Sequence, residues 1–299
     1  MMSWRARSRL LVTLVLSSAT ALVLALGIAG TPAGAETSLT GFYLDLGASA
    51  SVGFQPTGTN PRGERTTDGY ANDVVDHEAQ RGVTLDLTEL GCPGETTITM
   101  INGEDRCYHE DGSQLGDAMA FLRAHDGEEG IVTIDLGFND LRHCFHLGPA
   151  RQSCVDGQIS LLQEQLPYIL QSLEGVAGPG VSFVGVGFDD PYLADAISGR
   201  WGARFATHSE GVTDQLNGTL SAIYAAANIP MATVSNYFDT EDRWRVHLEG
   251  FGLVPENVAH ACELTWMCAP KPFGPNLHPN DAGYLVIAEA IESQLTAPW

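Results

Sequence analysis

Basic residues are scarce in this sequence. Its 299 residues include 15 lysines and arginines against 37 aspartates and glutamates, a formal net charge of −22. Only one lysine, Lys271, is present. A surface this negative repels phosphate backbones and anionic lipid headgroups. Nucleic acids and anionic membrane surfaces are therefore poor partners for this chain.

Two further absences narrow the function. After residue 35, no apolar run is long enough to cross a membrane. The sequence also has no P-loop and no G-x-G-x-x-G pattern at a strand–helix junction, so we expect neither a nucleotide nor any other cofactor.

The first 35 residues have the pattern of a secretory signal peptide. Three arginines near the start precede an apolar run over residues 10–29, and Ala33-Gly34-Ala35 forms a small-residue cleavage site. The alternative is an uncleaved membrane anchor, because the run is nearly long enough to span. We expect removal of residues 1–35, leaving residues 36–299 as a single secreted, monomeric domain without stable membrane insertion.

The six cysteines agree with export, because even cysteine counts in exported chains indicate disulfides. They form three local pairs separated by 15, 10 and 6 residues, although their order alone allows 15 connectivities. Neighbour pairing is favoured because each pair brackets a glycine-rich or polar loop. A metal site formed by the stretch HCFH (His143 to His146) with Cys154 is a weaker alternative, and we expect no metal. The favoured pairs are Cys92–Cys107, Cys144–Cys154 and Cys262–Cys268.

Strand patterns alternate with helix patterns along the mature chain. Short runs rich in Val, Ile, Leu and Thr predict strands, and apolar residues at helical spacing predict helices. Such alternation favours a parallel sheet with helices on both faces. The predicted strands are Phe42–Leu46, Val83–Leu90, Ile131–Leu136, Val181–Phe188 and Met231–Val234. The predicted helices are Leu115–His125, Ile159–Leu173 (with a kink or break at Pro167), Phe205–Ala227 and Asp281–Leu295, the last capped by Asn280.

Ligands of open parallel sheets bind beyond the carboxyl ends of the strands, so the residues that follow each strand matter most. The loops there offer a hydroxyl at Ser49, a flexible backbone N–H at Gly94, a carboxamide at Asn139 and, before the last helix, an imidazole at His278. Acyl transfer from an ester needs this set: a nucleophile, a base, and donors for the developing oxyanion.

These four blocks resemble those of the SGNH (GDSL-type) hydrolases. The block G-D-S-x-S is similar to Gly47–Ser51, with Ala48 in place of Asp; the second-block glycine matches Gly94; and G-x-N-D is intact at Gly137–Asp140. The block D-x-x-H-P matches at His278-Pro279, with Pro275 where the Asp should be. The resemblance covers nearly the whole mature chain and implies a flavodoxin-like three-layer α/β/α sandwich with a five-stranded parallel sheet.

By the same resemblance, Ser49 is the nucleophile and His278 the base. The oxyanion hole would combine the backbone N–H of Ser49, the N–H of Gly94 and the side-chain amide of Asn139. Ser51 is the runner-up nucleophile. The three local disulfides also resemble those of secreted actinobacterial members of the family.

The missing Asp at Pro275 raises the question of what orients His278. A backbone carbonyl at Pro275 that accepts the Nδ1 proton is the first expectation, giving a Ser–His dyad. Asn276 or Asp281 could swing in instead, although Asp281 suits the first turn of the last helix. A distant acid is the third alternative.

Asp45 and Asp135 each precede a loop glycine by two residues on strands that the family fold makes neighbours. They could therefore lie together and raise one pKa by like-charge repulsion. We favour the alternative in which each accepts backbone N–H bonds separately.

The first functional hypothesis is a secreted carboxylic-ester hydrolase, an esterase or lipase that forms an acyl-enzyme at Ser49 and acts on a small-molecule or lipid ester. A carbohydrate O-deacetylase of the same family is the second. A catalytically silent binding protein on the same fold is the third.

Overall fold

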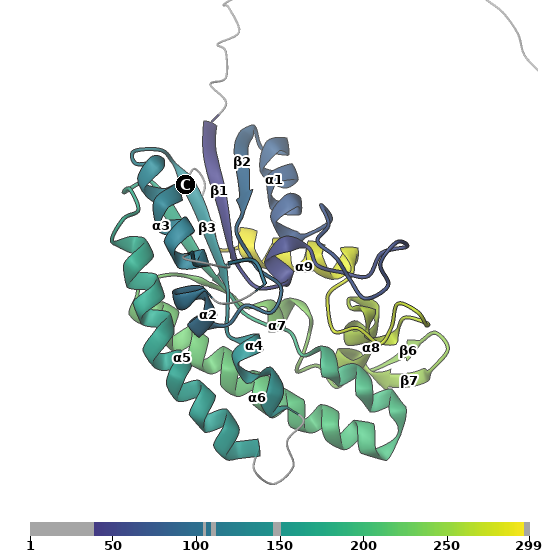
Figure 1. Ribbon diagram of the computed structural model, residues 1–299. Coiled ribbons are helices and arrows are strands. Elements are labelled where there is room, and N and C mark those ends of the chain that lie inside the picture. Colours follow the sequence, from purple (N-terminus) through teal and green to yellow (C-terminus); the bar gives the residue numbers. More distant parts are fainter. Residues whose placement is uncertain (1–38, 104–105, 109–111, 146–150, 296–299) are drawn as a thin grey trace, which may run out of the picture. The chain divides into compact units, whose positions relative to one another are not determined.

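The chain folds around five parallel strands in the order β2-β1-β3-β4-β5, of which β2, β1 and β3 are labelled in Figure 1. The sequence predicts the five parallel strands but not this order. This computed structural model describes residues 39–103, 106–108, 112–145 and 151–295. The strands are β1 (Leu39–Gly47), β2 (Val83–Glu89), β3 (Gly130–Asp135), β4 (Val181–Val186) and β5 (Met231–Ala232).

The middle of this sheet is shielded from solvent on both faces. Residues 42–47 of β1 and every residue of β3 are buried. Strands that are buried on both faces read as continuous apolar runs rather than as alternating ones, which is why the sequence pattern here was unambiguous.

Helices cover the two faces of the sheet. Helices α1 (Tyr70–Gln80) and α9 (Asp281–Glu292) pack together over one face, and α3 (Gln114–Ala124), α5 (Arg151–Glu174) and α6 (Arg200–Ala226) cover the other (Figure 1). The short helices are α2 (Thr97–Asn102), α4 (Phe138–Leu141), α7 (Val234–Tyr237) and α8 (Glu256–Glu263).

The strand order creates a topological switch point between β1 and β3. The chain leaves β1 toward α1 on one face and leaves β3 toward α5 on the other. A crevice forms where such neighbouring connections diverge, and ligands of this strand order bind there. The residues after β1 and β3 are those around Ser49 and Asn139.

The helices differ from the prediction in two respects. Pro167 does not end a helix: α5 runs through it from Arg151 to Glu174 and begins eight residues earlier than predicted. The sequence analysis also did not predict α1, in which Tyr70, Ala71 and Val74 are the buried apolar residues. Asn280 caps α9 as expected, accepting a hydrogen bond from the N–H of Gly283 at 3.1 Å.

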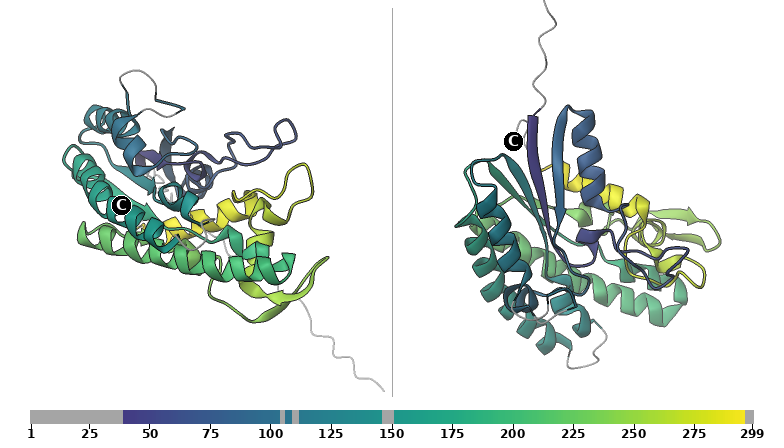
Figure 2. Two further views of the ribbon diagram at one scale, coloured as in Figure 1. Left: turned by 60° about the horizontal axis from the view of Figure 1, so that its bottom comes forward. Right: turned by 45° about the horizontal axis from the view of Figure 1, so that its top comes forward.

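A smaller layer lies beside the main sheet. The antiparallel strands β6 (Arg245–Leu248) and β7 (Gly252–Pro255) form a hairpin, drawn in yellow-green in Figure 2. This hairpin and α8 pack around a separate cluster of buried apolar side chains. This cluster also includes residues of the 3₁₀ segment η3 (Pro191–Ser198). The hairpin was not predicted, because its strands are short and largely exposed.

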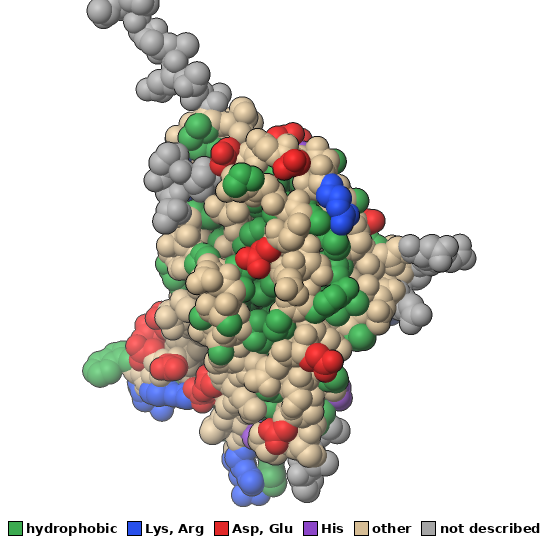
Figure 3. All heavy atoms as spheres, turned by 90° about the vertical axis from the view of Figure 1, so that its left-hand side faces the viewer, with side chains coloured by type: hydrophobic (Ala, Val, Ile, Leu, Met, Phe, Trp, Pro, Cys, Tyr) green, Lys and Arg blue, Asp and Glu red, His purple; other side chains and the backbone are tan. Residues whose placement is uncertain are grey.

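The six cysteines form three disulfides, each between neighbours along the chain: Cys92–Cys107, Cys144–Cys154 and Cys262–Cys268. The described residues fall within one compact unit, Ser38–Trp299, and include no helix long and apolar enough to span a membrane. The predicted signal peptide lies outside the described residues. On the face drawn in Figure 3, acidic side chains are scattered and basic ones are few.

Candidate active site

The first strand delivers Ser49 to the switch point. Strand β1 ends at Gly47, and Ser49 caps a short 3₁₀ turn, η1 (Ala50–Val52). Gly47 has φ +138°, and a Cβ atom there would lie 2.3 Å from the carbonyl oxygen of Asp135. Only glycine fits so close to β3, so the tight turn that exposes Ser49 depends on Gly47.

Ser51, the alternative nucleophile, faces into the protein. Its side chain is buried, and its hydroxyl donates to the carbonyl oxygen of Ala48 at 2.9 Å. Its backbone N–H donates to the carboxyl group of Asp135. Ser51 therefore stabilises the turn rather than facing the crevice.

His278 contacts Ser49 directly. Its Nε2 lies 3.0 Å from Oγ of Ser49, and its ring packs against Phe54 with centroids 4.8 Å apart. Burial, with a smaller contribution from the positive charge of Arg142, lowers the pKa of His278 to about 4. At neutral pH the imidazole is uncharged and can accept the serine proton.

The other imidazole nitrogen contacts a neutral amide. Oδ1 of Asn276 lies 2.6 Å from Nδ1 of His278 and accepts from the backbone N–H of His278 at 3.0 Å. Nδ2 of Asn276 donates to the carbonyl of Arg62 at 3.3 Å, which fixes which end of the amide faces the ring. The structure thus differs from the expected backbone partner: the Nδ1 contact is made by Asn276, not by the Pro275 carbonyl.

Asp281 also has a different partner. Its Oδ1 accepts from Nε2 of Gln55 at 2.8 Å, while Oε1 of Gln55 accepts from Nε1 of Trp266 at 3.0 Å. The hydroxyl of Tyr284 donates to the carbonyl of Phe54 at 2.8 Å. The loop that follows Ser49 is therefore tied to the segment that carries His278.

Asn139 lies at the carboxyl end of β3, in α4. Its Nδ2 donates to the carbonyl of Glu95 at 3.1 Å and its side chain is partly exposed to the crevice. Gly94, the residue before Glu95, has φ +98° and is exposed. It does not line the cavity described below, whereas Asn139 does.

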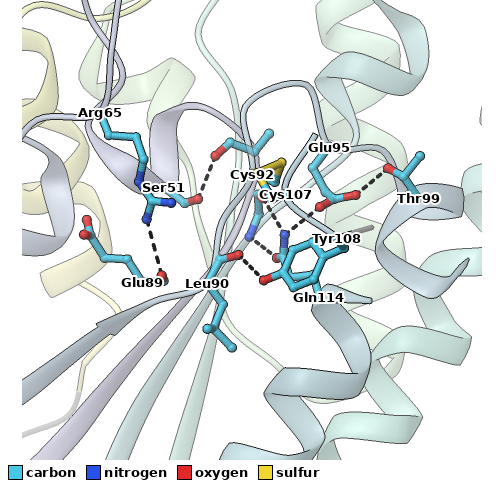
Figure 4. Close-up of a disulfide and its surroundings, with 12 residues drawn as sticks. Ser51, Arg65, Glu89, Leu90, Cys92, Glu95, Thr99, Cys107, Tyr108 and Gln114 are labelled. Carbon is cyan, nitrogen blue, oxygen red and sulfur yellow. Dashed lines mark hydrogen bonds between the residues drawn. A yellow bond between two sulfur atoms is a disulfide. The ribbon is translucent and has the colours of Figure 1, made fainter. Parts of the chain in front are cut away.

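A buried glutamine that the sequence analysis did not identify contacts the turn that carries Ser49 (Figure 4). Oε1 of Gln114 accepts from the N–H of Gly47 at 2.7 Å, and Nε2 donates to the carbonyl of Gly47 at 3.0 Å. The same Nε2 donates to Oε2 of Glu95 at 2.8 Å, and the other carboxyl oxygen of Glu95 accepts from Thr99. Both Gln114 and Glu95 are fully buried.

This network joins the two loops that flank the crevice. The N–H of Cys92 also donates to the carbonyl of Gly47 at 3.0 Å, and the Cys92–Cys107 disulfide closes the loop over residues 92–107 (Figure 4). Gln114 lies 67 residues from Gly47, so no local pattern could have revealed the contact. It supplies polar contacts to a turn in which the family's Asp is replaced by Ala48.

A cavity opens beside Ser49 and His278. Its volume is about 50 Å³, room for about four water-sized groups. Most of its wall is apolar, and two acidic side chains, Asp135 and Asp189, belong to it. The apolar lining side chains include Phe138, Val186, Phe188, Val234, Leu277 and Ile287.

Asp45 and Asp135 lie on neighbouring strands, as expected, but their partners differ. Asp45 accepts from hydroxyls, Thr133 Oγ1 at 2.6 Å and Tyr70 at 2.9 Å, rather than from backbone N–H groups. Burial is the main reason that the pKa of Asp45 is raised, and the charge of Asp135 adds to it. The favoured reading of separate backbone bonds therefore fits Asp135, through Ser51, but not Asp45.

The cluster of His143, Cys144 and Cys154 has no free thiol. The sulfurs of Cys144 and Cys154 are bonded to each other, and Nε2 of His143 lies 3.3 Å from Sγ of Cys154. His146 lies outside the described residues. Among the described residues, these three form the one group of three side chains close enough to share a metal ion, and the disulfide removes two thiolate ligands.

Comparison with known proteins finds one matching family. A model of the GDSL-like lipase/acylhydrolase family matches residues 46–286. No curated protein sequence shows a significant match.

Several solved structures share the fold. Phospholipase A1 from Streptomyces albidoflavus and an extracellular lipase from Streptomyces rimosus each superpose with a TM-score of 0.56 at 17% identity, covering 85% of this chain and 99% and 100% of their own. A lipase from a goat rumen metagenome gives a TM-score of 0.53 at 14% identity, with coverages of 85% and 96%. At these identities the likeness shows a common fold.

Proposed function

Because this chain belongs to the GDSL-like lipase/acylhydrolase family, we propose that it hydrolyses carboxylic esters through an acyl-enzyme at Ser49. The observation that carries the proposal is the 3.0 Å contact between Nε2 of His278 and Oγ of Ser49. A serine hydroxyl becomes a competent nucleophile only when a base within hydrogen-bond reach takes its proton.

In the first half-reaction, Oγ of Ser49 attacks the ester carbonyl carbon as its proton passes to Nε2 of His278. The tetrahedral intermediate then collapses, the bond to the alcohol oxygen breaks, and His278 returns the proton to the leaving alcohol. In the second half, His278 deprotonates a water molecule that attacks the acyl-enzyme, which releases the acid and regenerates Ser49.

The negative charge on the carbonyl oxygen needs donors that are already in place. Asn139 supports this role because one Nδ2 hydrogen is held by the carbonyl of Glu95, which leaves the second hydrogen available to the substrate. We assign the backbone N–H groups of Ser49 and Gly94 as the other two donors.

Asn276 takes the place of the acid. An amide oxygen that accepts the Nδ1 proton keeps the lone pair of Nε2 directed at Ser49. It offers a dipole rather than a full charge to the imidazolium that forms during the reaction. Cysteine proteases with a Cys–His–Asn arrangement use the same pairing.

The cavity favours short acyl groups over long ones. A volume of about 50 Å³ holds only a few non-hydrogen atoms. The same observation supports a carbohydrate O-deacetylase as the second candidate, because an acetyl group is the smallest common acyl group.

The three disulfides support the proposal that this protein folds in an oxidising compartment, where disulfides form and persist. We therefore propose that residues 1–35 are a cleaved signal peptide and that the domain over residues 36–299 is secreted as a monomer.

Nitrophenyl esters from acetyl to palmitoyl test the proposal on purified mature protein. We expect the highest kcat/KM at two to six acyl carbons, and Ser49→Ala should lower kcat by at least about a thousandfold. Ser51→Ala is the matched control and should retain most of the activity, since Ser51 faces the protein. Equal rates for the wild type and Ser49→Ala would identify a binding protein instead.

A further inference from the structure

Two carboxyl groups belong to the wall of the cavity beside Ser49. Asp135 is the last residue of β3 and is 2% exposed, and Asp189 lies three residues after the end of β4. Both line a cavity whose other walls are largely apolar. The proton transfers between Ser49 and His278 do not use either group.

Each carboxyl group is only half satisfied. One backbone N–H, that of Ser51, donates to Asp135, and the N–H of Asp189 donates to its own side chain. Oδ2 of each residue is buried and has no hydrogen-bond partner among the described residues. A buried oxygen left without a partner costs about 1–3 kcal/mol, so such a pair suits a ligand that can bond to it.

No cation compensates these groups in the part of the chain that the structure describes. Neither aspartate takes part in any of the ion pairs found there. The pKa of both carboxyl groups is raised to about 7, chiefly by burial and, for Asp135, also by the charge of Asp189. Near neutral pH, one group can therefore donate a hydrogen bond while the other accepts one.

We propose that this cavity is a specificity subsite for a short acyl group that carries a hydroxyl, bound between Asp135 and Asp189. The inference rests on the proposed ester hydrolysis and names its substrate class: esters of short hydroxy acids. The apolar side chains around the pair exclude water and hold the hydrocarbon part of the acyl group.

A hydroxyl fits the pair better than an ammonium group does. It both donates and accepts, which matches one protonated and one ionised carboxyl group. An ammonium group only donates, and its charge would have to be desolvated in a largely apolar cavity. A metal ion needs more ligands, and the two aspartates belong to no three-ligand cluster of the described residues.

The same geometry disfavours binding of an acyl group that lacks the hydroxyl. An acyl group with a methyl in place of the hydroxyl fills the space but leaves the two buried oxygens unpaired. Sites that hydrogen-bond a substrate hydroxyl reject the analogue that lacks it more strongly than apolar pockets reject an extra hydroxyl.

The first test compares nitrophenyl esters of two acids of equal shape, 3-hydroxybutyrate and 3-methylbutyrate. Each kcat/KM is divided by the rate of the ester's hydrolysis by hydroxide, which removes differences in intrinsic reactivity. We expect the hydroxylated ester to be favoured by about tenfold or more in the wild type, the value of one well-made hydrogen bond. A ratio near one, or a stronger preference for the 3-aminobutyrate ester, overturns the proposal.

The second test removes one acid. Asp189→Leu should reverse the preference, so that the 3-methylbutyrate ester becomes the better substrate. Asp190→Asn is the matched control: the neighbouring Asp190 bonds to Oγ of Ser209 at 2.7 Å and to the N–H of Tyr192 at 3.0 Å, and an amide can keep both contacts. Asp190→Asn should retain the wild-type ratio. An unchanged ratio in folded Asp189→Leu overturns the proposal.

A binding measurement separates this inference from the proposed reaction. The Ser49→Ala protein, which cannot form an acyl-enzyme, is titrated calorimetrically with methyl 3-hydroxybutyrate and methyl 3-methylbutyrate. About tenfold tighter binding of the hydroxy ester supports the subsite even if no ester is hydrolysed. Equal binding overturns the subsite even if Ser49 proves to be the nucleophile.

Discussion

Oδ1 of Asn276 lies 2.6 Å from Nδ1 of His278, at the place where an aspartate would orient the base in a triad. The amide is held from two sides, by the N–H of His278 and by the carbonyl of Arg62. A neutral amide in this place can orient the imidazole of His278 but cannot compensate its charge with a charge of its own.

Substitutions at Asn276 should separate those two effects. Asn276→Leu removes the acceptor for Nδ1 and should lower kcat about a hundredfold with little change in KM. Asn276→Asp keeps an acceptor and adds a negative charge, so it should raise the apparent pKa of His278 toward its ordinary value. Steady-state kinetics from pH 4 to pH 8 measure both. A Leu variant with the wild-type kcat would show that Asn276 does not orient the base.

The dependence of kcat/KM on pH should report the pKa of His278. Because burial disfavours the charged imidazole and lowers its pKa to about 4, the base stays neutral far below pH 6.5. For an unsubstituted ester such as nitrophenyl acetate, kcat/KM should rise with pH through about 4 and be nearly level from pH 5.5 to 6.5. A rising limb centred at 6.5 would contradict this environment. Circular dichroism at each pH distinguishes titration from unfolding.

Loss of the Asn139 amide should destabilise the transition state more than the bound substrate. Asn139→Ala should lower kcat by about a hundredfold to a thousandfold, with KM changed far less, because a donor to an oxyanion matters only after the charge has formed. Asn139→Asp is a useful companion, since it places a negative charge beside the oxyanion and should be at least as slow. Retention of full kcat in Asn139→Ala would remove the residue from the oxyanion hole.

We expect Gln114 to act through the turn that carries Ser49 rather than on the substrate. Gln114→Leu removes its contacts to Gly47 and Glu95, and we expect kcat to fall at least about tenfold while KM changes little. Gln114→Glu keeps an acceptor for the N–H of Gly47 and should recover part of the rate. The matched control is Gln171→Leu, on the exposed surface of α5. Equal kcat losses in Leu and Glu variants of equal thermal stability would indicate a packing role only.

Stability should decline as the solution becomes alkaline. Burial raises the pKa of Asp190 to about 8 and that of Asp135 and Asp189 to about 7, far above the value for an unfolded chain. The folded state therefore keeps protons that the unfolded state has released, so this stabilisation is complete below about pH 4 and is lost as pH rises through 7 and 8. His278 has the opposite sign: its contribution is complete above about 6.5 and is lost as pH falls through 4.

Between about pH 4 and 6.5 the three carboxyl groups outweigh the single imidazole, so these signs together predict a Tm that is highest near pH 4 and lower by about 5 °C or more at pH 8.5. Scanning calorimetry in buffers of equal ionic strength measures the decline. Asp190→Asn should flatten it, because the amide does not titrate. A Tm that rises between pH 6 and pH 8.5 would contradict the raised carboxyl pKa values.

Much of the fold was predictable because the central strands are short and apolar with clear boundaries. The position of Ser49 after β1 and of Asn139 after β3 followed from the same boundaries, since parallel strands end at one edge of the sheet. The group that contacts Nδ1 of His278 could be narrowed only to several alternatives, of which Asn276 was not the first expectation. Whether an amide or a backbone carbonyl reaches Nδ1 depends on the local path around Pro275, and the sequence pattern does not encode that path.

Contacts between polar residues far apart in the sequence could not be predicted either, for a related reason. Gln114 looks like an ordinary first residue of a helix, and its burial arises only when α3 packs beside β1. The half-satisfied pair of Asp135 and Asp189 likewise depends on how the ends of β3 and β4 open onto one cavity. Hydrophobic periodicity describes the layers of this fold, whereas polar contacts depend on tertiary structure.

The loop that ties the Ser49 segment to the His278 segment also has a consequence for folding. The two residues are 229 positions apart, and contacts such as Gln55 to Asp281 span nearly the same distance. Closing so large a loop is entropically slow, so these contacts form late. A chain in which α9 (Asp281–Glu292) has not docked contains both Ser49 and His278 but does not hold them together, so we expect no activity until the final helix has docked. Hydrolytic activity thereby becomes a readout of complete folding.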